Sequence, residues 1–146
     1  KGLVNVSTTD RVTPEEDSQA LELRYTQNSD FYRTFTWKDS DDAVQTVSSA
    51  YMQAKTTAGV TVLDLRWYSS KPTEATVIAL SPANTRGYLI DGEAADTTLD
   101  MHISDKNDIA AGTYTYDLFV QDSAGDWDVL AAGSLVVEAA TSSNPY

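Results

Sequence analysis

Acidic side chains are the residues of this sequence best suited to chemistry, and three of them share one short segment. Asp39, Asp41 and Asp42 place hard oxygen ligands, the kind that Ca²⁺ prefers, within one predicted turn. The segment lacks the glycine and the distal glutamate of a helix–loop–helix calcium site. We therefore expect no cofactor, and we keep Ca²⁺ at these three residues as the alternative.

The single histidine, His102, offers little for catalysis. One imidazole cannot build a His-rich metal site, and no nucleophile lies near it in the sequence. It falls on the polar side of a predicted strand, so we expect it at the surface. Because Gly-rich phosphate loops and Ser-His-Asp spacing are also missing, we predict that the chain is not an enzyme.

Charge and composition exclude several classes of protein. The 146 residues include 22 Asp and Glu but only 10 Lys and Arg, giving a net charge of −12. A charge of this sign repels phosphate backbones, so we predict no nucleic-acid partner. No apolar run approaches the length of a membrane span or a signal peptide, and without cysteine there is no disulfide framework.

Apolar residues alternate with polar ones along most of the chain, which is typical of half-buried strands. Turn signals separate about eight or nine such runs, a spacing typical of an antiparallel β-sandwich. One run is 76–80, a hairpin is expected to turn at Asp91-Gly92, and one short helical turn is expected near 104–109. The inward-facing set is predicted to include Leu21, Leu23, Tyr25, Phe35, Trp37, Ala50, Met52, Ala54, Leu63, Leu65, Leu99, Met101, Ile103, Tyr114, Tyr116, Leu118, Val120, Trp127, Val129, Ala131, Leu135 and Val137.

The pattern divides the chain into an extended N-terminal arm (1–19), a sandwich domain (20–138) and a polar C-terminal tail (139–146). The arm carries a brief apolar patch, and two tyrosines lie opposite the inward face of their strands. Exposed apolar and aromatic residues of this kind are typical of protein interfaces. The predicted interface residues are Leu3, Val4, Val6, Tyr32 and Tyr51.

An ordered series of short blocks resembles a small domain that recurs in tailed phages. The blocks are 31–41 (FYRTFTWKDSD), 47–55 (VSSAYMQAK), 61–65 (TVLDL), 89–92 (LIDG), 99–104 (LDMHIS) and 111–118 (AGTYTYDL). In this order they are similar to the N-terminal domain of siphophage upper baseplate proteins. The stretch after Asp42 and the longer loop at 68–86 depart from that pattern.

The resemblance implies an immunoglobulin-like sandwich and a virion structural protein, assembled in the host cytoplasm. Such a protein docks on or connects other virion proteins, by attaching tail, baseplate or fibre parts or by decorating the head. Its partners would be other virion proteins, with self-association left open. The alternative is a carbohydrate-binding β-sandwich module with a row of exposed aromatic residues.

Overall fold

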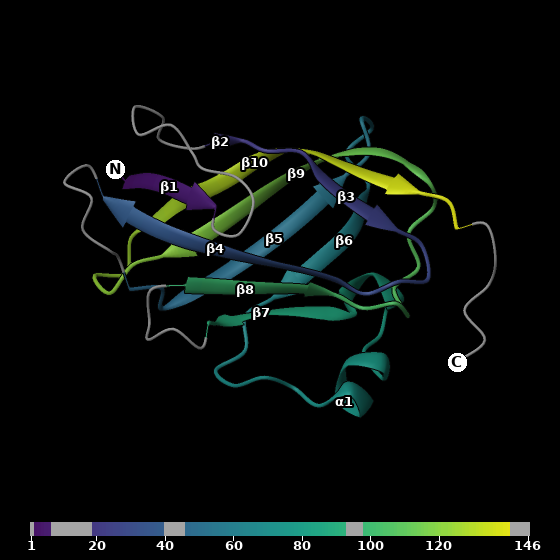
Figure 1. Ribbon diagram of the computed structural model, residues 1–146, viewed down its shortest axis with the longest axis horizontal. Coiled ribbons are helices and arrows are strands. Elements are labelled where there is room, and N and C mark those ends of the chain that lie inside the picture. Colours follow the sequence, from purple (N-terminus) through teal and green to yellow (C-terminus); the bar gives the residue numbers. More distant parts are fainter. Residues whose placement is uncertain (1, 7–18, 40–45, 93–97, 141–146) are drawn as a thin grey trace.

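The computed structural model describes residues 2–6, 19–39, 46–92 and 98–140, and within them ten strands form two sheets packed face to face (Figure 1). The four-stranded sheet runs in the order β1 (Gly2–Val6), β4 (Phe31–Asp39), β8 (Thr98–Ile103) and β7 (Gly87–Asp91). The six-stranded sheet comprises β2 (Gln19–Ala20) and β3 (Leu23–Thr26) beside β10 (Trp127–Glu138), followed by β9 (Gly112–Gln121), β5 (Ser49–Lys55) and β6 (Thr61–Arg66). This arrangement confirms the all-β sandwich.

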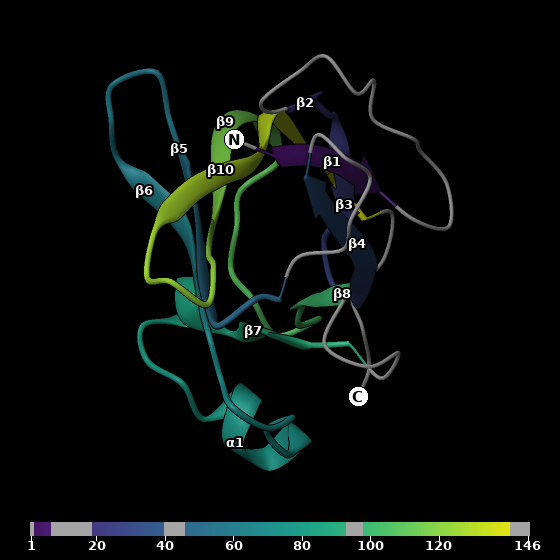
Figure 2. The same ribbon diagram turned by 90° about the vertical axis from the view of Figure 1, so that its left-hand side faces the viewer.

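Neighbouring strands run antiparallel, except where β2 and β3 pair in parallel with successive halves of β10. Figure 2 shows the two layers from the side, with β5, β6, β9 and β10 in one and β4 and β8 in the other. Within the predicted arm, β1 pairs antiparallel with β4 of the same chain, from Gly2 opposite Asp39 to Val6 opposite Phe35.

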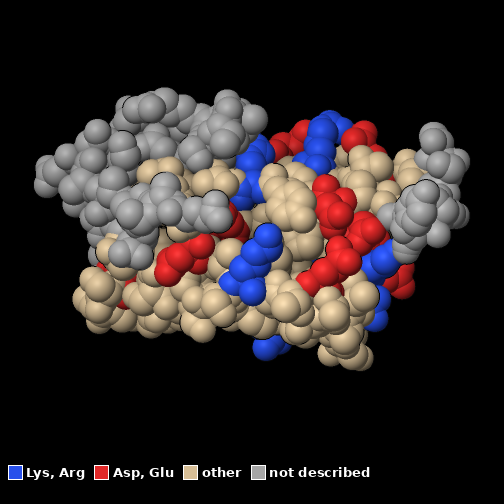
Figure 3. Space-filling model, turned by 60° about the horizontal axis from the view of Figure 1, so that its bottom comes forward, with Lys and Arg blue, Asp and Glu red and all other residues tan. Residues whose placement is uncertain are grey.

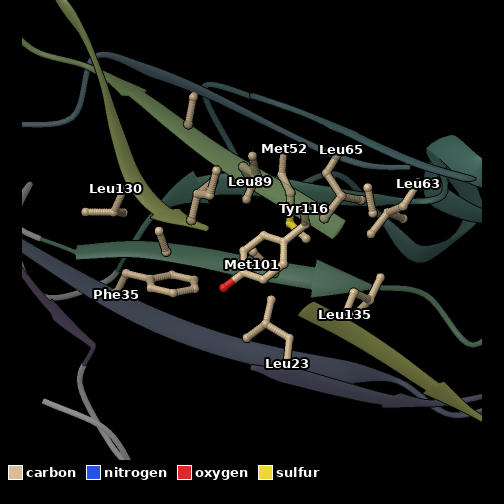
Figure 4. Close-up of a cluster of buried hydrophobic side chains, with 14 of the residues drawn as sticks. Leu23, Phe35, Met52, Leu63, Leu65, Leu89, Met101, Tyr116, Leu130 and Leu135 are labelled. Carbon is tan, nitrogen blue, oxygen red and sulfur yellow. The ribbon is translucent and has the colours of Figure 1, made fainter. Parts of the chain in front are cut away.

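The core lies between the sheets and is built from the predicted inward faces (Figure 4). Tyr116 of β9 is fully buried among these side chains, with Leu23 and Phe35 reaching toward it from β3 and β4 in Figure 4. Its hydroxyl donates a hydrogen bond to the carbonyl oxygen of Leu21, 2.6 Å away. A buried hydroxyl without an acceptor costs about 1–3 kcal/mol, so this bond matters more than an average surface one.

Leu21 lies between β2 and β3, where the chain passes close over β10. A Cβ atom added to Gly133 of β10 would approach the Leu21 carbonyl oxygen to 2.7 Å and its nitrogen to 3.0 Å. Gly133 also has a φ of 151°, a backbone angle that residues with a side chain rarely adopt. Only glycine therefore fits where the chain crosses β10.

A β-bulge divides β10 into two parts whose alternation is out of phase. Val129 lies opposite Phe119 and Ala131 opposite Leu118, so Leu130 is the extra residue. Leu130 and Ala131 are both fully buried, although they are consecutive. The predicted inward positions of Trp127 and Val129 are therefore wrong: Trp127 is 46% exposed and Val129 only partly buried. Tyr114, at the start of β9, is also only partly buried.

The predicted strand at 76–80 is wrong, because this segment contains a short helix, α1 (Glu74–Ile78). The Thr73 hydroxyl caps its first turn by accepting a hydrogen bond from the Thr76 backbone nitrogen, and Glu74 adds a favourable negative charge there. The helix buries Val77 alone. Local capping decided the structure here, whereas the alternation of apolar residues suggested a strand.

Of the predicted helical turn at 104–109, the structure contains a single hydrogen-bonded turn over residues 104–107. The Asn107 backbone nitrogen donates to the Ser104 carbonyl oxygen, and the Ser104 hydroxyl accepts from the Lys106 nitrogen. These bonds close one turn, after which the chain is not helical. The hairpin after Asp91 is present, but Gly92 bonds to Thr98, so its loop is longer than the two residues predicted.

Replacing Gly133 with alanine should destabilise the protein by about 2–4 kcal/mol, because the new Cβ would meet the Leu21 backbone at an unfavourable φ. Gly59 provides the matched control, since it also has a positive φ but no atom within 4 Å of an added Cβ. Gly59→Ala should cost about 1 kcal/mol. Urea unfolding of the two variants measures both losses, and equal losses would contradict the close approach.

Candidate functional site

Three aromatic rings form a row across the outer face of the four-stranded sheet. His102 of β8 lies directly opposite Tyr32 of β4 on one side and Tyr88 of β7 on the other. The Tyr32 ring stacks on the imidazole, with centroids 4.5 Å apart and planes inclined by 11°. The Tyr88 ring is tilted by 51°, with its centroid 4.9 Å from that of His102.

The expectation that His102 is a surface residue is wrong: it faces outward from the sheet, but only 7% of it is exposed. The tyrosines on both neighbouring strands enclose it. Its Nε2 lies 2.9 Å from Oδ1 of Asp30, which also accepts a hydrogen bond from the Asp105 backbone nitrogen. The Asp30 carboxylate thereby joins the start of β4 to the loop after β8.

A pocket of about 400 Å³ opens beside this row. The sheet supplies its aromatic floor, and the segment leading into α1 supplies the facing wall, with Lys71, Thr73, Glu74 and the buried Val77. Seen from the side of β7 and α1, acidic side chains gather in two groups on this face with a basic side chain between them (Figure 3). We call the hollow the His102 pocket; its lining is Asp30, Tyr32, Lys71, Pro72, Thr73, Glu74, Val77, Tyr88, His102, Ser104 and Asp105.

The electrostatic environment of the pocket is negative. Partial burial and the carboxylates of Asp30, Glu74 and Asp105 raise the pKa of Tyr32 above its ordinary value. Burial, Tyr32, Asp100 and Asp30 raise the pKa of Tyr88 in the same direction. Both hydroxyls are therefore neutral at physiological pH, and the pocket holds polar but uncharged phenols next to fixed negative charges.

A second group of rings lies on the outer face of the six-stranded sheet. Tyr51 of β5 is opposite Phe119 of β9, and their rings stack with centroids 4.7 Å apart. The rings of Trp127 and Tyr51 make an edge-to-face contact, with centroids 5.4 Å apart. We call Tyr51, Phe119 and Trp127 the outer aromatic patch.

Two open hollows flank the outer aromatic patch. One, of about 590 Å³, is lined by Ser49, Ala50, Tyr51, Gln53, Asp64, Arg66, Trp67, Tyr68 and Trp127. The other, of about 410 Å³, is lined by Tyr51, Gln53, Lys55, Thr56, Thr57, Gly59, Thr115, Asp117 and Phe119. The outer aromatic patch thus lies between two hollows that are lined by both polar and apolar side chains.

The structure separates the predicted interface residues. Tyr32 and Tyr51 both face outward as predicted, but they lie on opposite sheets and belong to different clusters. Leu3, Val4 and Val6 belong to β1, whose backbone pairs with β4. The predicted calcium ligands Asp39, Asp41 and Asp42 lie outside the residues whose side chains are described.

Within the described ranges, no group of three His, Cys, Asp or Glu side chains is arranged to hold a metal ion. Over the same part of the chain, no helix is long and apolar enough to cross a membrane.

Sequence reasoning missed the partners that give each cluster its character. Phe119 was not singled out, and Trp127 was placed in the core. The sequence does not link Asp30, Glu74 and Tyr88 to His102, because the register of β4, β8 and β7 and the packing of α1 bring them together. Alternation predicts which face a residue occupies, but it does not say which residue lies across from it.

Comparison with known proteins supports the fold alone. No protein-family model matches the chain. No curated protein matches it either. Among solved structures, the GspB Siglec domain has a TM-score of 0.52 at 14% identity, over 96% of this chain and 58% of that one.

Two further structures have lower scores. The fibronectin(III)-like modules of Clostridium thermocellum CbhA have a TM-score of 0.42 at 11% identity, over 100% of this chain and 51% of theirs. Murine CRIg has a TM-score of 0.41 at 10% identity, over 82% of this chain and 92% of its own. The chain therefore spans little more than half of the first two structures. The fold of the protein is an immunoglobulin-like β-sandwich.

Tyr25, behind the His102 pocket, provides a test of the surrounding structure through pH. Its hydroxyl donates to the Ser104 carbonyl oxygen at 2.9 Å, and burial together with Asp105 and Asp30 raises the pKa of Tyr25 to about 12. The unfolded chain loses this proton near pH 10, whereas the folded chain retains it. The contribution of this pKa difference to the free energy of unfolding is therefore fully present below pH 10. It is lost as the pH rises toward 12, at about 1.4 kcal/mol per pH unit.

We expect Tyr25→Phe to lower stability by about 1–2 kcal/mol at pH 8, since the buried Ser104 carbonyl loses its donor. The difference from the unmodified protein should shrink between pH 10 and 12. Burial also raises the pKa of Tyr116, but that residue is present in both proteins and affects both alike. Urea unfolding at a series of pH values measures the difference, and a constant gap would contradict the shift.

Proposed function

We propose that this protein is a docking domain of a tailed-phage virion, which binds another virion protein through the outer aromatic patch. The observation that carries the proposal is the outward-facing cluster of Tyr51, Phe119 and Trp127 on a sheet face, in which Trp127 is exposed and the other two rings are half-buried. Large rings exposed together on a protein surface mark binding surfaces far more often than single exposed apolar residues do.

The geometry of the patch suits binding. Tyrosine and tryptophan supply much of the binding energy at protein interfaces. Tyr51 is held between the rings of Phe119 and Trp127, so little side-chain freedom remains to be lost when a partner binds. Its strand lies between two others in the sheet, which makes the platform rigid.

The phage assignment rests on the ordered series of blocks between 31 and 118 that resembles siphophage baseplate domains. The net charge of −12 is compatible with that role, because acidic proteins assemble at high copy number without sticking to nucleic acid. Its partners would be other virion proteins, and its location would be the particle.

A second candidate function is carbohydrate binding, favoured by the hollow beside Trp127. That hollow combines aromatic side chains with polar groups from Gln53, Asp64 and Arg66. Arg66 donates to both carboxylate oxygens of Asp64, at 3.1 and 2.7 Å, so these groups are already oriented. Glycan binding that depends on Trp127 would favour this function over protein docking.

The docking proposal is tested with purified particles of the phage that encodes the chain. We expect the chain in those particles, and a mass-spectrometric copy number separates a tail part from a head decoration. Particles made without the chain should bind it when the purified protein is added. The Trp127→Ala variant should bind these particles at least tenfold more weakly, since loss of a hot-spot aromatic costs about 2 kcal/mol.

Val60→Thr and Ile78→Thr are the matched controls, because both replace exposed apolar residues outside the outer aromatic patch. Both should bind particles as the unmodified chain does. Absence of the chain from purified particles would overturn the virion role. Full binding by Trp127→Ala would overturn the docking surface, and a Trp127-dependent signal on a glycan array would replace it with the second candidate.

A further inference from the structure

We propose that the His102 pocket binds the guanidinium group of an arginine side chain from a partner protein. The pocket lies on the four-stranded sheet, away from the outer aromatic patch on the six-stranded one. Only the idea that the arginine comes from a virion protein rests on the proposed function. The chemistry of the pocket is independent of it.

The protonation of His102 follows from its neighbour. A carboxylate can only accept a hydrogen bond, so the proton between His102 Nε2 and Asp30 Oδ1 belongs to the imidazole. In the neutral ring Nδ1 is then an acceptor. Nδ1 is buried and has no hydrogen-bond partner among the described residues. The residue is more than nine-tenths buried, so one residue of the pocket lining has a ring nitrogen without a hydrogen bond to the described residues.

The remaining groups of the pocket also favour a donor-rich cation. Asp30, Glu74 and Asp105 contribute three carboxylates, whereas Lys71 is the one cationic side chain of the lining. Lys106, outside the lining, lies 3.8 Å from Asp105 and offsets part of that charge. Asp30 and Glu74 are therefore the carboxylates that we expect to pair with a guanidinium group. Both also raise the pKa of Tyr32.

Tyr32 supplies a surface for the flat face of the cation. One face of its ring is stacked on His102, while 63% of the residue is exposed. Guanidinium groups stack on tyrosine faces and donate in their own plane to nearby carboxylates. A sugar is uncharged, whereas this lining carries three carboxylates against one ammonium group. An arginine therefore fits it better than a glycan does.

The test uses N-acetyl-L-arginine amide as the probe, titrated into the full chain and followed by NMR. We expect a dissociation constant on the order of millimolar, as befits a single small side chain, weakening as salt is added. The shifted signals should come from residues of the His102 pocket. N-acetyl-L-citrulline amide, which has nearly the same shape but no charge, should bind at least fivefold more weakly.

Tyr32→Ala should weaken binding of the arginine probe about two- to fivefold, whereas Tyr32→Phe, which keeps the ring, should bind nearly as well as the unmodified chain. Glu74→Gln should weaken it to a similar extent as Tyr32→Ala. Asp117→Asn is the control, because this exposed carboxylate lies on the six-stranded sheet. It should bind the probe normally.

Equal binding of the citrulline probe, or no binding of the arginine probe, would overturn the cation site. Unchanged binding by both Tyr32→Ala and Glu74→Gln would overturn its location. None of these outcomes touches the particle-binding test of Trp127→Ala, because that variant changes the other sheet. Failure of the virion role would likewise leave arginine binding to the pocket intact.

Discussion

The hydrogen bond from the Tyr116 hydroxyl to the Leu21 carbonyl is the interaction on which the rest of the sandwich depends. It brings a polar group into the centre of the core and gives it one acceptor, which fixes where the chain passes from β2 to β3. Gly133 leaves room for that passage. Because β2 and β3 pair with successive halves of β10, the position of Leu21 also sets their register, and Leu23 and Tyr25 enter the core in consequence.

The same construction explains why the two clusters of rings lie apart. Each sheet buries one face against the other, so side chains able to bind a partner must occupy the two outer faces. On one face the rings enclose a histidine that is bonded to an exposed carboxylate, and on the other they stack only on each other. The first cluster is therefore polar and negative, and the second is apolar and open.

Much of the fold could be predicted, because alternation reflects burial directly. The inward positions on β3, β5, β8 and most of β9 follow from it, as does the exposure of Tyr32. It failed at the Thr73 cap, where a local interaction outweighed it, and in β10, where the bulge shifts its phase. The His102 pocket was beyond prediction, since three strands, the helix α1 and loops distant in sequence meet there.

The bulge in β10 has a consequence for tracing relatives of this chain. Leu130 is the residue inside β10 that is skipped in its pairing with β9, and the residues on either side would alternate without interruption if it were missing. A relative lacking that residue would keep Trp127 outward and Ala131 inward. The correct alignment would then carry a one-residue gap inside a strand, where gaps are usually penalised most. An ungapped alignment would instead match the exposed tryptophan to a neighbouring inward position.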